Sequence, residues 1–326
     1  MIIIKRLLTN PTSLAGIVLL FAFLVMAIAA PWIAPPPKNA RDPYMIPRDG
    51  FRTEPAGPSA EHPLGTTEGQ YDIFYGVVWG TRTAFRIGVV ITVCTAIIGL
   101  TVGSISAFYG GRIDDVMMRI TEVFQAFPFL LAAITLTSVL QTIYGRGEAG
   151  PLMFLAKILA MVTFGSNPTK DIDPVQLQIL TGMLAIIAFG WMTYARVIRG
   201  NIMVVREEEY ALAARAIGVG NLRILVRHLL PNAVFPVLVI ASMNTGSYVL
   251  NFAALSFLGL GAQRGYADWG QMINFARNWI PSLAQHWHIV TYPGLAIVLF
   301  VLAWNLVGDA LRDILDPRMR GNGNGF

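Results

Sequence analysis

Long uncharged, apolar runs alternate with shorter charged segments along most of the chain. A helix needs about 20 apolar residues to cross the hydrocarbon core of a bilayer. Runs close to this length are expected to form spans near residues 14–33, 87–110, 123–144, 177–195, 233–250 and 292–310. The pattern therefore predicts an all-α membrane protein with six transmembrane helices.

The polar segments divide the chain into four regions. We expect an N-terminal region with the first span in residues 1–33, a loop in residues 34–82, a transmembrane domain in residues 83–316 and a tail in residues 317–326. The first run could instead be a signal peptide, because Ala27-Ile28-Ala29 is typical of a cleavage site. The length of this run and the spans that follow it favour a retained helix.

Residues 145–173 do not fit a simple alternation of spans and short links. Pro151–Phe164 is apolar but short, and Lys157 lies inside it. A charge at the bilayer centre costs about 2.5–3.5 kcal/mol on insertion scales. We therefore expect residues 145–173 to add an interfacial or re-entrant element on the extracytoplasmic side. A seventh crossing here would invert every later segment.

Residues 200–232 are both charged and helix-patterned, between two apolar runs. Met203–Ile217 suits a helix, which Gly218 and Gly220 would end, one of them in a left-handed turn. Asn221 can cap a second helix that Pro231 would stop. The expected product is a loop of two short helices joined by a tight corner.

Composition supports an integral membrane protein. The chain has 326 residues, of which 55% are hydrophobic and 13% charged, whereas soluble domains have about 25% charged residues. The net charge of +5 is explained by Lys and Arg at cytoplasmic membrane surfaces and does not require a nucleic-acid partner. Cys94 lies in an apolar run and is expected to be a small buried hydrophobic residue.

The distribution of Lys and Arg sets the expected orientation. With six alternating spans, these residues are more numerous on the side of the amino terminus, which marks that side as cytoplasmic. Both termini and residues 200–232 are then cytoplasmic, and residues 34–82 and 145–173 are extracytoplasmic.

Candidate catalytic and metal sites are few. The adjacent Asp114 and Asp115 could serve acid–base chemistry or metal binding, but no further ligand lies at suitable spacing, so a solvated turn is expected. His286 and His288 flank Trp287, and an aromatic belt at the membrane interface is favoured over a metal site.

The sequence also argues against an independent energy source. No lysine follows a glycine, so the chain lacks the phosphate-binding loop of nucleotide hydrolases. A secondary transporter would usually carry acids within its spans and two related halves, and neither is evident. An energised partner is the simplest remaining explanation.

Motifs in residues 200–232 resemble a known pattern. Ala213-Ala214-x3-Gly218, then nine residues, then His228-Leu229-Leu230-Pro231 resembles the EAA loop of ABC-importer permeases, with Leu212 at the place of its Glu and His228 at the place of its Ile. In such permeases this loop docks on the ATPase. The resemblance implies that the coupling residues are Glu209, Tyr210, Ala213, Ala214, Arg215, Gly218 and Pro231.

Four further motifs resemble the C-type subunit of dipeptide, oligopeptide and nickel ABC importers. They are His62–Thr66 followed by Gly80-Thr81-Arg82, Tyr109–Asp115 followed by Phe127-Pro128, Ser256–Gly261 followed by Trp269–Met272, and Gly308–Arg318. Gln70-Tyr71, Gly76 and residues 145–173 depart from the family pattern.

This resemblance implies the type I importer permease fold and a place in the cell inner membrane. It implies a second permease subunit, two ATPase subunits that bind ATP and Mg, and an extracytoplasmic solute-binding protein. The chain itself would be no enzyme and hold no cofactor or metal. It would form half of the path for di- or oligopeptides, moved by alternating access. The alternative is a subunit of a non-importing ATPase complex, such as an exporter or a scaffold.

Overall fold

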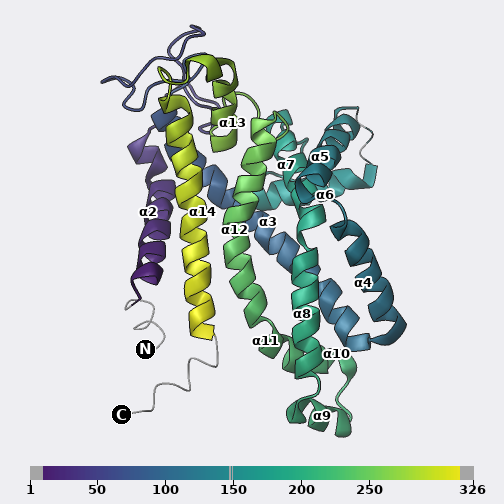
Figure 1. Ribbon diagram of the computed structural model, residues 1–326. Helices are drawn as coiled ribbons and strands as arrows, with labels where there is room; N and C mark the ends of the chain where they lie inside the picture. The colour runs from purple at the N-terminus through teal and green to yellow at the C-terminus, as the bar shows by residue number, and fades with distance from the viewer. Residues whose placement is uncertain (1–9, 147, 149, 316–326) are drawn as a thin grey trace, which may run out of the picture.

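The computed structural model describes residues 10–146, 148 and 150–315 (Figure 1). The expected tail at residues 317–326 lies outside the described residues. Within the described ranges the secondary structure is helical, with isolated β-bridges but no strand.

Five helical segments are long and apolar enough to cross a membrane. They are α2 (Pro11–Ile33), α3 (Ile73–Tyr109), the run Pro174–Val205 made of α7 (Pro174–Gly190) and α8 (Met192–Val205), α12 (Phe235–Phe257) and α14 (His288–Leu315). A sixth is obtained if α4 (Gly111–Gln125) and α5 (Phe129–Gly145) are counted as one bent span. These segments confirm the all-α membrane fold.

Small residues let the long helices approach closely. A Cβ on Gly103 of α3 would collide with the carbonyl of Ala195 on α8, and a Cβ on Gly16 of α2 would collide with Leu306 on α14. A Cβ on Gly246 of α12 would lie 3.0 Å from the Cα of Val301 on α14, which is also a tight contact. Such contacts are typical of membrane helices, whose association is driven by close van der Waals packing because lipid tails are as apolar as the side chains.

The third expected span, residues 123–144, is not one straight helix. α4 and α5 meet at 87°, and the break falls between Gln125 and Phe129. Pro128 explains the break, because it disfavours helical geometry in the residue before it and has no N–H to donate. α4 therefore leads away from the axis of α5 (Figure 1).

Other helix ends also differ from the expected bounds. α3 begins at Ile73, within the expected loop 34–82, because the Asp72 side chain caps it by accepting a hydrogen bond from the Tyr75 N–H at 2.8 Å. α8 continues to Val205, beyond the expected end at residue 195. α6 (Gly150–Phe164) fills the segment 145–173 and packs on α7.

Two segments from opposite parts of the sequence fold together as a loop cap, residues 34–72 and 258–287. The second segment includes α13 (Trp269–Asn274) and the 3-10 helix η2 (Phe275–Ser282). The Glu68 carboxylate joins the two segments, because it accepts hydrogen bonds from Arg264 at 2.7 Å, Asn278 at 2.8 Å and Trp279 at 3.2 Å.

A histidine fastens the first segment of the loop cap to α3. His62 Nδ1 lies 2.7 Å from the Asp72 carboxylate, and His62 Nε2 lies 2.8 Å from the Asp49 carboxylate. Partial burial alone would lower the pKa of His62, but these two acids outweigh it and raise the pKa.

Candidate coupling site

The segment between α8 and α12 begins with an anchor to another helix. α8 ends at Val205, and the next residue, Arg206, donates a hydrogen bond from Nη1 to the Ala107 carbonyl near the end of α3 at 2.9 Å. Arg206 Nε also donates to Glu207 at 2.9 Å. The start of the loop is thereby fixed to the end of α3.

A single helix over Met203–Ile217 was expected, and this prediction is wrong. The chain turns after Val205 and starts again as α9 (Glu209–Ala216). Glu208 has an extended backbone, and acids at the start of α9 interact favourably with its dipole. α9 is therefore a separate short helix at the far end of the molecule from the loop cap (Figure 1).

Gly218 ends α9 in the left-handed region, with φ of +81°. The Val219 N–H bonds to the Ala214 carbonyl at 3.1 Å, and the Gly218 N–H bonds to the Arg215 carbonyl at 3.0 Å. This is the Schellman arrangement, which favours glycine at this position. The expected left-handed turn is confirmed at Gly218, whereas Gly220 has negative φ and is the N-cap of the next helix.

The second half of the loop is less regular than expected. α10 (Asn221–Ile224) is followed by a π-helical turn, η1 (Leu225–Leu229), and then by α11 (Leu230–Ala233). Pro231 lies in the first turn of α11 instead of stopping a helix, and the Leu230 N–H bonds to the Leu225 carbonyl. Pro231 has no N–H, so a normal α-helical ladder could not pass through it. Asn221 begins α10 but does not cap it.

The coupling residues named from the sequence fall into two groups. The exposed group is Glu209, Tyr210, Ala213, Arg215, Gly218 and Pro231. Ala214 instead is buried in the chain's own core, together with Ala211. Of these two alanines, only Ala213 is therefore exposed on the surface of α9.

The sequence analysis did not predict that apolar side chains would be exposed at the same corner, and it named Leu212 only for its place in the motif. Leu212 is 46%, Ile217 81% and Leu222 74% exposed. We call α9 with these three side chains the coupling tip, residues 209–222. A short charged helix with exposed leucines and isoleucine at its corner is typical of a surface that another protein covers.

An ion pair between α4 and α8 was also missed. Asp114 was expected to lie in a solvated turn, but it is buried and accepts hydrogen bonds from Arg199 Nε at 2.6 Å and Arg199 Nη2 at 2.5 Å. Ser106 on α3 donates to the same carboxylate. Asp114 therefore joins α3, α4 and α8, while the neighbouring Asp115 is exposed.

Comparison with known proteins identifies the family. Residues 99–321 match the family model described as binding-protein-dependent transport system inner membrane component. The chain belongs to this permease family. Residues 2–53 also match the N-terminal transmembrane domain of oligopeptide transport permease C. As a member, the permease is a multi-pass membrane protein that works with an ATPase and a binding protein.

Several curated relatives are similar to the permease over nearly its full length. It is 33% identical to the dipeptide transport system permease protein DppC of Alkalihalophilus pseudofirmus over 97% of this chain and 89% of the relative. It is 33% identical to the glutathione transport system permease protein GsiD of Pectobacterium atrosepticum over 92% of this chain and 86% of the relative. It is 32% identical to the probable D,D-dipeptide transport system permease protein DdpC of Escherichia coli over 96% of this chain and 89% of the relative.

The remaining candidate residues of the permease lie in structural surroundings. His286 in the loop cap and His288 at the start of α14 are both buried, and His286 packs edge-on against Trp279 with ring centroids 4.9 Å apart. In the part of the chain that the structure describes, no three His, Cys, Asp or Glu side chains are placed to share a metal ion. Cys94 is half-buried within α3.

Proposed function

We propose that this chain is the C-type permease subunit of an ATP-driven importer for di- or oligopeptides. It pairs with a second permease subunit, two ATPase subunits and an extracytoplasmic solute-binding protein. The similarity to dipeptide permeases along the full chain supports the cargo class. The single observation that carries the coupling role is the exposed tip of α9 with its left-handed turn at Gly218.

The arrangement of the ends supports the orientation. The start of α2 and the end of α14 lie at the same end of the molecule as α9, and the loop cap lies at the opposite end (Figure 1). Both termini and the coupling tip are then cytoplasmic, and the loop cap faces the binding protein. α6 has 15 residues, fewer than a crossing needs, and adds an element on the extracytoplasmic side.

The contacts of the loop suggest how ATP energy reaches the path. The ATPase would move α9, and α9 follows α8 directly in the chain. Arg206 ties this junction to α3, and Arg199 ties α8 to Asp114 on α4. A displacement of the coupling tip would thus move three helices together, as alternating access requires.

Replacement of Ala213 by Trp tests this proposal. Trp at this exposed position keeps α9 but prevents close approach of a partner, so we expect the ATPase to be lost in pull-down. Binding-protein-stimulated ATP hydrolysis and uptake of a labelled dipeptide into proteoliposomes should fall with it. Ala284→Trp, at an exposed position of the loop cap, is the matched control and should retain the ATPase.

The results separate the alternatives. Normal pull-down and normal uptake by the Ala213→Trp complex would remove the coupling role of α9. Wild-type complexes that move peptide only outward, or not at all, would favour an exporter or a scaffold instead.

A further inference from the structure

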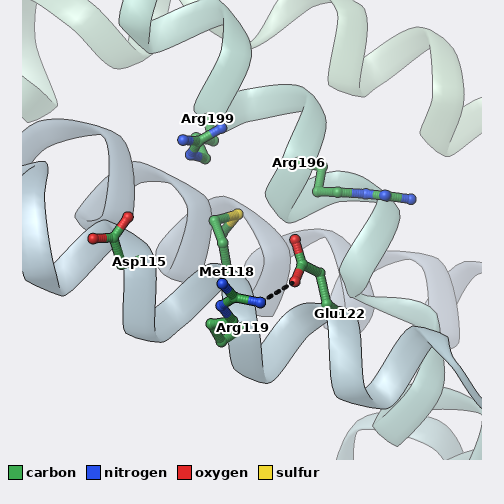
Figure 2. A pocket seen from close by; sticks show the side chains of 6 residues that line it. All are labelled: Asp115, Met118, Arg119, Glu122, Arg196 and Arg199. Atoms are coloured by element: carbon green, nitrogen blue, oxygen red, sulfur yellow. Dashed lines mark ion pairs between the residues drawn. The ribbon is translucent and has the colours of Figure 1, made fainter.

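A hollow of about 540 Å³ lies between α4 and α8, on the half of the molecule that carries the coupling tip (Figure 1, Figure 2). Its lining is strongly charged, because five of the six lining residues are acidic or basic. The lining residues are Asp115, Met118, Arg119, Glu122, Arg196 and Arg199.

The charges that remain available in this hollow are balanced. Arg199 is already neutralised by the buried Asp114. Arg119 and Arg196 line the hollow together with Asp115 and Glu122. The Arg119 Nη1 to Glu122 Oε2 distance of 3.9 Å is too long for a hydrogen bond. Arg196 has no ion-pair partner among the described residues.

The position of Arg196 requires access to water or to a charged partner. It was expected to mark the end of a span at residue 195, but α8 continues to Val205, about 15 Å beyond residue 195 at 1.5 Å per residue. Ionisable side chains on membrane helices face water-filled cavities or the bundle interior, because exposure to lipid is costly. In Figure 2, Arg196 extends on the side of Glu122, and Asp115 lies on the opposite side of the hollow.

The surroundings place the hollow at an open face of the chain. α4 packs on α3 and α8, whereas Val116 and Val123, on another side of this helix, are 58% and 61% exposed. In the proposed heterodimer, the second permease subunit can cover the hollow at this face.

The mixture of positive and negative side chains in the hollow indicates which kind of molecule can bind there. An anionic lipid headgroup would be favoured by cations alone, but here two carboxylates offset two free guanidinium groups. A small zwitterion with separated charges can offer a carboxylate to the unpaired Arg196 and an ammonium to Glu122 in place of its loose contact with Arg119, because charge-assisted hydrogen bonds are the stronger ones. A peptide with free termini has these two charges.

We propose that the hollow is a transit site for the charged termini of a zwitterionic cargo. Arg196 binds the carboxylate of the cargo, and Glu122 binds its ammonium group in place of Arg119. This inference rests on the proposed peptide-importer function and assigns residues on the cytoplasmic half of the path.

Photo-crosslinking tests the inference in the complete complex with its ATPases and binding protein. A benzophenone amino acid replaces Met118, and a radiolabelled dipeptide is transported in proteoliposomes under illumination. Replacement of Val116, which is exposed on another side of α4, is the matched control. Arg119, with a side chain 84% exposed, is a second labelling position if the Met118 variant does not assemble.

We expect an ATP-dependent peptide adduct at residue 118 and little at residue 116. Adding Arg196→Gln should lower this adduct about tenfold, because a hydrogen bond to a charged group is lost. A lipid adduct or an adduct with the second permease at residue 118, or equal peptide labelling at both positions, would overturn the transit site. Complexes without any peptide uptake would instead refute the proposed function on which it rests.

Discussion

Breaking the contact between Asp114 and Arg199 should loosen the connection between α4 and the helix that leads to the coupling tip. Asp114→Asn removes the negative charge but keeps nearly the same size. Breaking a fully buried ion pair costs about 3–5 kcal/mol. The Asp114 side chain is 9% exposed but that of Arg199 is 31% exposed, so water compensates part of the loss. We expect a loss of about 2 kcal/mol in the free energy of unfolding.

A double-mutant cycle measures the pair itself. Asp114→Asn, Arg199→Gln and the double variant are unfolded at equilibrium by increasing SDS in mixed micelles. The expected interaction energy is about 1–2 kcal/mol, because the two side chains share two hydrogen bonds. Asp115→Asn is the matched control, since this neighbour is exposed, and its effect should stay within about 0.5 kcal/mol.

The same variants test transmission of movement. If the ion pair carries motion from α8 to α4, Asp114→Asn complexes should retain the ATPase but show less uptake per ATP hydrolysed. Additive effects in the cycle, within about 0.5 kcal/mol, together with unchanged uptake per ATP, would refute the reasoning.

Three further predictions concern pH and topology. Because the pKa of His62 is raised, the stabilisation from its contacts with Asp49 and Asp72 is complete below about pH 6.5 and is lost as the pH rises through the folded-state pKa. Amide exchange in residues 49–66, corrected for intrinsic rates, should therefore accelerate from pH 6 to pH 8. His62→Asn should abolish this pH dependence, and its persistence would exclude His62 as the cause. Burial raises the pKa of Asp268 to about 6, partly opposed by the hydrogen bond from the backbone N–H of Gln271. As the pH rises from about 4 to 6, the unfolded state loses this proton before the folded state does, so the free energy of unfolding should fall over this range. Thermal unfolding of Asp268→Asn should lack this slope, and an identical slope would contradict the assignment. With Cys94 replaced, a cysteine at Ser166 should react with an impermeant thiol reagent from outside, and one at Asn221 only after the membrane is opened; the reverse labelling would invert the orientation.

Local signals in the sequence predicted a large part of the fold. Apolar runs located the long helices, because bilayer thickness sets their length. The Gly218 turn was predictable because only a few neighbouring backbone groups determine it. The bend at Pro128 also has a local signal, but hydropathy alone joined the two helices into one span.

Contacts between distant residues could not be predicted in this way. Asp114 and Arg199 are 85 positions apart, and the sequence around Asp114 is as compatible with a solvated turn as with a buried ion pair. The burial of Ala214 likewise depends on the tertiary position of α9. Residues 213 and 214 are both alanine and have the same helix propensity, so the sequence alone does not show which of them is buried.

The Glu68 contacts also bear on how the chain is made. The partners of Glu68 at residues 264, 278 and 279 follow it by 196, 210 and 211 positions. At a synthesis rate of roughly 5–20 residues per second, they emerge from the ribosome about 10–40 s later. The first segment of the loop cap therefore waits, without the partners of this carboxylate, while most of the chain is still being translated and inserted. A nascent chain arrested before residue 264 should be open to proteases at residues 49–72, so closure of the cap follows the synthesis of every long helix except α14.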